Sequence, residues 1–207
     1  MSSGSTESDR NTWEARFYLP WKSTIIYDDK NNNFVLIEKI NTNVLSKEAK
    51  QSVMNALNTW KSLEIEGVAR LINYELSNGE IVINVLVRSN KSLFDLISRG
   101  NTNLLDTIKI LARTCEVLEK ASKQGIIHGD VRPENIFIDD SGNVEIANWG
   151  LKAALIRHLL SGEDRVDYRA IAYLAPEQIP SEESMEITDR VDVFLLACTL
   201  YEALCGN

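Results

Sequence analysis

Short runs of β-branched and aromatic residues, separated by polar turns, dominate the first part of the chain. Such runs predict strands at 17–19, 24–27, 34–40, 68–74 and 81–87, with turns at 28–33 and 77–79. Between them, residues 46–63 carry Val53, Leu57 and Trp60 at helical spacing behind a capping Ser46, which predicts one helix. We therefore expect a small, mainly β unit with a single helix.

The periodicity becomes helical in the second part of the chain. Apolar residues three and four apart predict an amphipathic helix that ends at Gly125, with one face formed by Leu104, Ile108, Leu111, Cys115 and Leu118. A polar turn at 139–143 between two apolar triplets predicts a hairpin. Residues 189–204 are apolar nearly all round, which predicts a centrally buried helix. Together the two parts predict an α+β protein with a β-rich lobe and a helical lobe.

Composition and charge limit the classes of function. The chain has 207 residues, of which 44% are hydrophobic and 25% charged, as in ordinary globular proteins. A formal net charge of −8 argues against nucleic-acid binding, which needs a basic surface. The sequence has no apolar run that predicts a membrane span. The polar residues 1–10 predict a disordered lead-in rather than a secretory signal.

The cysteines add a prediction about the redox environment. Cys115, Cys198 and Cys205 lie in apolar, helical stretches and lack the spacing of metal ligands. We expect reduced, buried thiols, which fit a cytoplasmic location.

Residues 128–135 carry the clearest motif, His-Gly-Asp-Val-Arg-Pro-Glu-Asn. The motif resembles the catalytic loop of protein kinases, H-R-D-x-K-P-E-N. Asn148-Trp149-Gly150 stands where that family has Asp-Phe-Gly, and residues 173–177 resemble the end of its activation loop. Asp192 opens the apolar helix at the corresponding place. Because these signals occur in the family's order, the chain is similar to a eukaryotic-like Ser/Thr protein kinase.

The resemblance implies a bilobal fold, with a kinase-like N-lobe over residues 11–88 and a partial C-lobe over 89–207. It also implies ATP and Mg²⁺ as cofactors and gives residues of the loop their roles. Asp130 matches the base that orients the substrate hydroxyl, and Asn135 matches a metal ligand. Arg132 replaces the lysine near the γ-phosphate, which keeps the charge but changes its geometry.

Several positions depart from the family. Asn148 replaces a metal-binding aspartate, and a neutral amide is a poor ligand for Mg²⁺ beside a polyphosphate. Glu38 stands where the phosphate-binding lysine is expected. Lys39, the remaining candidate for cofactor binding, points to the opposite face of the strand unless a bulge shifts it. Residues 49–63 supply no acidic partner for such a lysine.

The glycine loop that holds the phosphates is also missing. No glycine occurs between Gly4 and Gly67, and the connection expected between the first two strands is residues 20–23, Pro-Trp-Lys-Ser. Trp21 would crowd a phosphate there. Gly129 replaces the arginine that pairs with a phosphorylated activation loop in the family.

These losses favour a catalytically impaired, pseudokinase-like module that binds or regulates protein partners, and they count against ATP and Mg²⁺ binding. One alternative is a divergent but active Ser/Thr kinase that relies on Asp130, Asn135 and a displaced Lys39. Another is a small-molecule phosphotransferase of the aminoglycoside or choline type, which has a similar loop but carries Asp where Asn148 stands and lacks the Ala-Pro-Glu segment. The oligomeric state stays open.

The chain stops soon after residues 189–204, before the closing helices that the resemblance implies. We expect this to leave an apolar face uncovered around Phe194, Leu200 and Leu204. On that expectation, a longer chain has a higher melting temperature and aggregates less.

Overall fold

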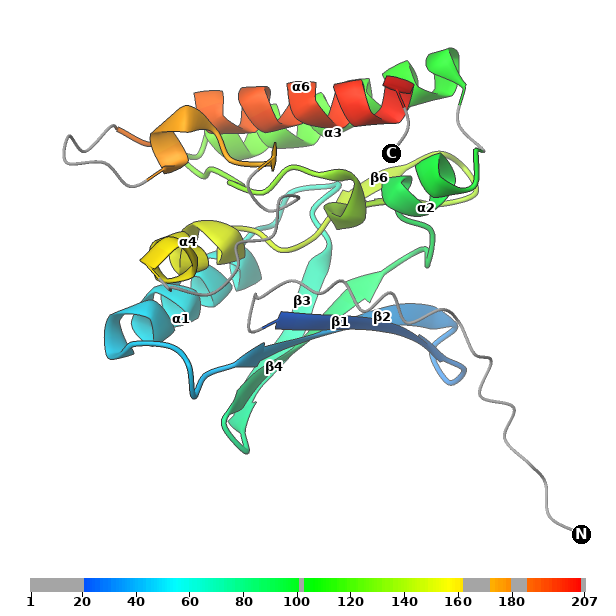
Figure 1. Ribbon diagram of the computed structural model, residues 1–207. Coiled ribbons are helices and arrows are strands. Elements are labelled where there is room, and N and C mark those ends of the chain that lie inside the picture. Colours follow the sequence, from blue (N-terminus) through cyan, green and yellow to red (C-terminus); the bar gives the residue numbers. More distant parts are fainter. Residues whose placement is uncertain (1–20, 101–102, 162–171, 180–185, 206–207) are drawn as a thin grey trace, which may run out of the picture.

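The computed structural model describes residues 21–100, 103–161, 172–179 and 186–205. Its first part is a four-stranded antiparallel sheet in the order β1-β2-β4-β3. The strands are β1 (Trp21–Asp28), β2 (Asn33–Asn41), β3 (Arg70–Ser77) and β4 (Glu80–Val87). Helix α1 (Lys47–Lys61) lies between β2 and β3 in the chain and buries its predicted face in the same core as the sheet (Figure 1).

The structure shifts two of the predicted boundaries. Residues 21–23 belong to β1 and not to a connecting loop, because they pair in regular register with residues 38–40 of β2. Strand β3 begins at Arg70, since Val68 and Ala69 pair with Ile146 of the second lobe instead. The strand predicted at 17–19 lies outside the described residues.

The second part is mainly helical and contains the predicted hairpin. Its elements are α2 (Leu93–Ser98), α3 (Leu104–Ser122), η1 (Pro133–Asn135), β5 (Ile136–Ile138), β6 (Val144–Ile146), α4 (Leu151–Ser161), η2 (Pro176–Gln178) and α6 (Arg190–Cys205). Helices α3 and α6 pack side by side, and α4 packs against α1 of the first part (Figure 1). The α+β, two-lobed architecture predicted from the sequence is confirmed.

The buried face of α3 matches the predicted one only in part: Leu111 and Leu118 are buried as expected, but the other predicted residues are not. Its buried residues are Thr107, Ile110, Leu111, Thr114, Val117, Leu118 and Ala121. Leu104 and Ile108 are 59% and 50% exposed, and Cys115 is exposed as well. The buried stripe is thus rotated from the predicted one and includes Thr107, Thr114 and Ala121, whose small side chains permit close helix packing. The expectation of buried thiols is wrong for Cys115 and also for Cys205, which is exposed.

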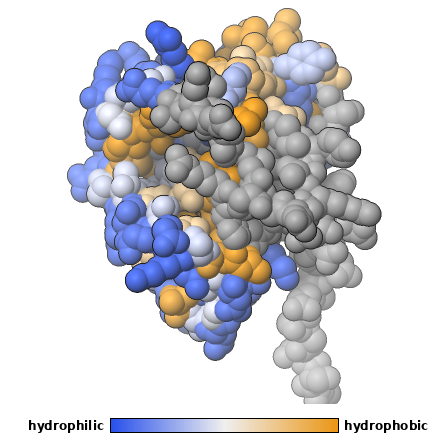
Figure 2. Space-filling model, turned by 60° about the vertical axis from the view of Figure 1, so that its left-hand side comes forward, coloured by the Kyte–Doolittle hydropathy of each residue, from blue (hydrophilic) through white to orange (hydrophobic). Residues whose placement is uncertain are grey.

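Helix α6 is not buried all round. Val191, Leu195 and Thr199 are among its buried residues, whereas other apolar side chains face outward. These are Val193, Phe194, Leu200, Tyr201 and Leu204, between 37% and 71% exposed. The uncovered face expected around Phe194, Leu200 and Leu204 is therefore present, and Figure 2 shows hydrophobic residues at the top of the molecule, where α6 and α3 lie in Figure 1. Within the described ranges, no helix is long and apolar enough to cross a bilayer.

Candidate active site

Residues 128–135 form a buried loop between α3 and β5 that α6 holds in place. The Asp192 carboxylate, in the first turn of α6, accepts hydrogen bonds from the backbone N–H groups of His128 and Gly129, each at 2.8 Å. The His128 ring accepts from the Asp130 amide through Nδ1, so its Nε2 donates to the Ala147 carbonyl at 2.8 Å. Trp149 packs edge-on against the same ring. These contacts fix the loop on which Asp130 lies.

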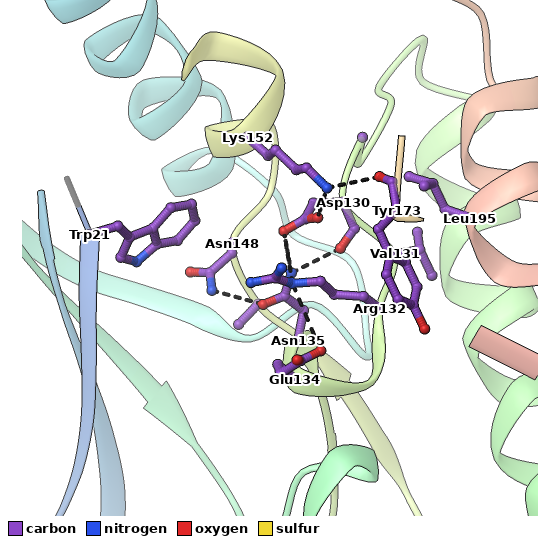
Figure 3. A network of polar contacts seen from close by, with 12 residues as sticks. Trp21, Asp130, Val131, Arg132, Glu134, Asn135, Asn148, Lys152, Tyr173 and Leu195 are labelled. Atoms are coloured by element: carbon purple, nitrogen blue, oxygen red, sulfur yellow. Dashed lines mark hydrogen bonds and ion pairs between the residues drawn. The ribbon is translucent and has the colours of Figure 1, made fainter. Parts of the chain in front are cut away.

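Both carboxylate oxygens of Asp130 are engaged. Its Oδ1 accepts from Lys152 Nζ at 2.9 Å, and its Oδ2 accepts from Asn135 Nδ2 at 2.8 Å. The Arg132 Nε lies 3.4 Å from Oδ2 (Figure 3). Burial opposes ionisation, but the positive charges of Arg132 and Lys152 outweigh it and lower the pKa of Asp130 below its usual value. Asp130 is therefore a buried, ion-paired carboxylate.

Glu38 reaches this region from the first lobe. The ladders of β2 with β1 and β4 run through Glu38 without a register shift, so Glu38 is buried and Lys39 lies on the exposed face. The Glu38 carboxylate accepts hydrogen bonds from Trp21 Nε1, Ser23 Oγ and Asn148 Nδ2. Burial raises the pKa of Glu38 to about 7, even though these bonds favour the ionised form.

Asn148 connects the two lobes. Its Nδ2 donates to Glu38 Oε1 and to Asn135 Oδ1, both at 3.0 Å. Its backbone φ is 69°, a left-handed conformation that asparagine adopts more readily than most residues. The side-chain Oδ1 is buried and has no hydrogen-bond partner among the described residues. Figure 3 shows Asn148 between Trp21 and Asn135, and through Glu38 the amide joins β2 to the loop of Asp130.

The predicted site residues are thus largely brought together. Asp130, Arg132, Asn135 and Asn148 form one network (Figure 3). Lys39 does not join it, because the bulge that would turn it inward is absent from β2. Lys152 belongs to the network although the sequence gave no reason to select it. A lysine two residues after Gly150 resembles any exposed residue of a first helical turn, and only the tertiary packing buries it to 2% exposure.

ATP with Mg²⁺ does not fit these residues. The side chain turned into the site from β2 is a carboxylate, and Asn148 offers a neutral oxygen where a metal bound to a polyphosphate needs charge. The Oδ1 of Asn135 already accepts from Asn148.

Comparisons with known proteins agree with the bilobal fold and the loop. The protein kinase domain family matches residues 23–207, so the chain belongs to this family. Probable serine/threonine-protein kinase pknA2 of Bifidobacterium longum is 33% identical over 55% of this chain and 14% of its own length. Serine/threonine-protein kinase cds1 of Schizosaccharomyces pombe is 29% identical over 78% of this chain and 35% of its own. The chain therefore spans about a third or less of these relatives.

A solved structure shows the same fold. The crystal structure of Rad53 1-466 in complex with AMP-PNP aligns with 93% of this chain and 47% of its own, with a TM-score of 0.66. At 20% sequence identity, this likeness shows the fold alone. The predictions of a kinase-like fold and of similarity to Ser/Thr protein kinases are confirmed.

Proposed function

We propose that this protein kinase domain does not transfer phosphate and serves as a binding or regulatory module for other proteins. The observation that carries the proposal is Glu38, a fully buried carboxylate at the position where the family resemblance calls for a phosphate-binding lysine. A lysine there attracts a polyphosphate, whereas Glu38, with a pKa raised to about 7, supplies no cation and repels phosphate in its ionised form.

Two further features support the same function. The three donors around Glu38 are already used in a network that closes on the chain itself, so nucleotide phosphates would have to displace it. Asn148 contributes no negative charge to hold Mg²⁺, and metal-assisted charge neutralisation is a main part of phosphoryl transfer. Because the chain offers neither a phosphate-binding cation at position 38 nor a charged metal ligand at position 148, we expect it to act by binding other proteins rather than by transferring phosphate.

A divergent, active Ser/Thr kinase is the second candidate. It is favoured by one observation, the hydrogen bond between Asp130 and Asn135, which keeps the carboxylate and the amide of the catalytic loop together at 2.8 Å. A small-molecule phosphotransferase has less support, because the matched family and the named relatives are protein kinases.

Isothermal titration calorimetry tests the proposal. We expect the purified chain to bind ATP weakly or not at all, and to respond equally in Mg²⁺ and in EDTA. The matched control carries Glu38→Lys and Asn148→Asp, which restore the charges that the resemblance calls for, and should gain Mg²⁺-dependent binding if the fold is intact. Tight, Mg²⁺-dependent binding by the unaltered chain would overturn the proposal in favour of the divergent kinase.

A further inference from the structure

Lys152 connects three separate segments of the second lobe. It is the second residue of α4, the helix that follows Asn148-Trp149-Gly150, and its side chain is 2% exposed. Its Nζ donates to Asp130 Oδ1 at 2.9 Å and to the Tyr173 carbonyl oxygen at 2.8 Å (Figure 3). One ammonium group therefore ties the start of α4 and residue 173 to the loop of Asp130.

The chemistry of this contact favours a strong tie. A lysine removed from water is stable as a cation only when its charge is paired and its N–H groups are bonded. Desolvation lowers the pKa of Lys152, and the charge of Asp130 works against that effect. Removing either partner leaves the other charge buried with less compensation, which costs more than the loss of an exposed ion pair.

The backbone around Lys152 is close to the same loop. Gly129 has a φ of +76°, and a Cβ built there would lie 3.3 Å from the Cβ of Ala153 in α4. Gln178 Nε2 donates to the Gly129 carbonyl at 2.9 Å. Helix α4 and the segment at 173–178 therefore both pack against the loop at 128–135, α4 beside Gly129 and the segment through the Gln178 hydrogen bond.

We propose that Lys152 is an ionic lock, which sets the arrangement of the second lobe around the loop of Asp130. Its ammonium binds Oδ1 of Asp130, the carboxylate oxygen that does not bond Asn135. By the same bonds it holds α4 and residue 173 on the loop in a single arrangement. Lys152 acts as a positioning residue through Asp130 and Tyr173. The inference deepens the proposed function and rests on it in one respect, that Asp130 does not serve catalysis.

Amide hydrogen exchange followed by mass spectrometry tests the lock on the whole chain without nucleotide. Lys152→Met keeps the length of the side chain and removes its charge. We expect exchange at least tenfold faster in peptides covering 128–135 and 172–178, with β4 unchanged. Lys152→Arg, which keeps the cation, should recover most of the protection. Lys39→Met, at an exposed lysine, is the matched control and should leave exchange unchanged.

A double variant separates an ionic lock from simple packing. Asp130→Asn combined with Lys152→Met removes both charges, so we expect slower exchange than in Lys152→Met alone. It also serves as the folded comparison if Lys152→Met unfolds. The proposal is overturned if Lys152→Met exchanges like Lys39→Met, or if the double variant is less protected than Lys152→Met. Because no ATP is present, such a result is distinguishable from a failure of the calorimetric test.

Discussion

At the scale of single residues, Glu38 is compensated by hydrogen bonds rather than by a direct ion pair. Its carboxylate accepts from Trp21, Ser23 and Asn148. None of the ion pairs between described residues includes it, although Arg132 acts on it at longer range. Neutral donors offset only part of the cost of burying a charge. Burial is therefore the larger effect, and the pKa rises to about 7.

This pKa predicts a pH dependence of stability. In the range between the usual glutamate value of 4.5 and about 7, the folded state holds the Glu38 proton more tightly than the unfolded state. The stabilisation is full below that range and is lost as the pH rises through 7, by at most about 3 kcal/mol. Urea unfolding at pH 5 and pH 8 should show a larger decrease in the free energy of unfolding for the unaltered chain than for Glu38→Gln. Parallel pH profiles would show that Glu38 titrates normally.

The substitution Asn148→Asp gives a second prediction at this scale. It restores the metal-binding aspartate of the family but places a second carboxylate where an amide now donates to Glu38 at 3.0 Å. We expect no phosphotransfer to a generic protein substrate, because Glu38 remains, and a lower melting temperature from the repulsion of like charges. Adding Glu38→Lys should recover the melting temperature. Clear phosphotransfer by Asn148→Asp alone would contradict both this prediction and the proposed function.

The sequence was sufficient to find Asp130, Asn135 and Asn148, because each belongs to a motif with a fixed order. It also placed Glu38 and Lys39 on opposite faces of a strand, since side chains in a strand alternate. It did not reveal that Trp21 bonds to Glu38 from a paired strand. Nor did it reveal that Lys152 is part of the site. The burial of Lys152 depends on how α4 packs against the rest of the molecule, and the local sequence pattern does not predict it.

At the scale of elements, capping and strong periodicity predicted α1 well, whereas α3 was predicted correctly in length and only in part in its buried face. In α1 only one stripe is apolar, and it is buried. In α3, Leu111 and Leu118 are buried as predicted, but the rest of the buried face is formed by residues such as Thr107, Thr114 and Ala121 instead of the other predicted residues. Hydrophobicity alone cannot predict this face, because it depends on how closely a neighbouring helix approaches.

The N-cap of α1 provides a quantitative test at this scale. Ser46 is exposed, and its Oγ accepts from the Ala49 amide at 3.1 Å. Ser46→Ala removes this bond and should lower the free energy of unfolding by about 1 kcal/mol. Ser52→Ala, at an exposed position inside the same helix, should change it by less than about 0.5 kcal/mol and in the stabilising direction. Equal effects of the two changes, measured by urea unfolding, would mean that the cap does not stabilise the helix.

At the scale of the whole molecule, one set of contacts joins the two lobes and another holds the second lobe together. The two lobes meet where α1 packs against α4 and where the Asn148 amide, just before α4, donates to Glu38 of β2. Across the second lobe, α6 holds the loop through Asp192 on its buried side. Its opposite side carries exposed apolar residues, and the first turn of α3, the helix that packs beside α6, exposes Leu104 and Leu105. Exposed apolar surface of this kind promotes association.

The exposed side of α6 predicts that charge introduced there is tolerated. Val193 and Tyr201 are 68% and 71% exposed, so Val193→Lys and Tyr201→Lys should each change the free energy of unfolding by no more than about 0.5 kcal/mol. Both should reduce self-association in light scattering, because they interrupt the apolar surface with positive charge. Leu195→Lys on the same helix is the matched control: its side chain is 0% exposed, and a lysine there should unfold the chain. If Val193→Lys or Tyr201→Lys destabilises the chain as strongly as Leu195→Lys, this side of α6 is packed against other residues in solution and the exposure described above is wrong.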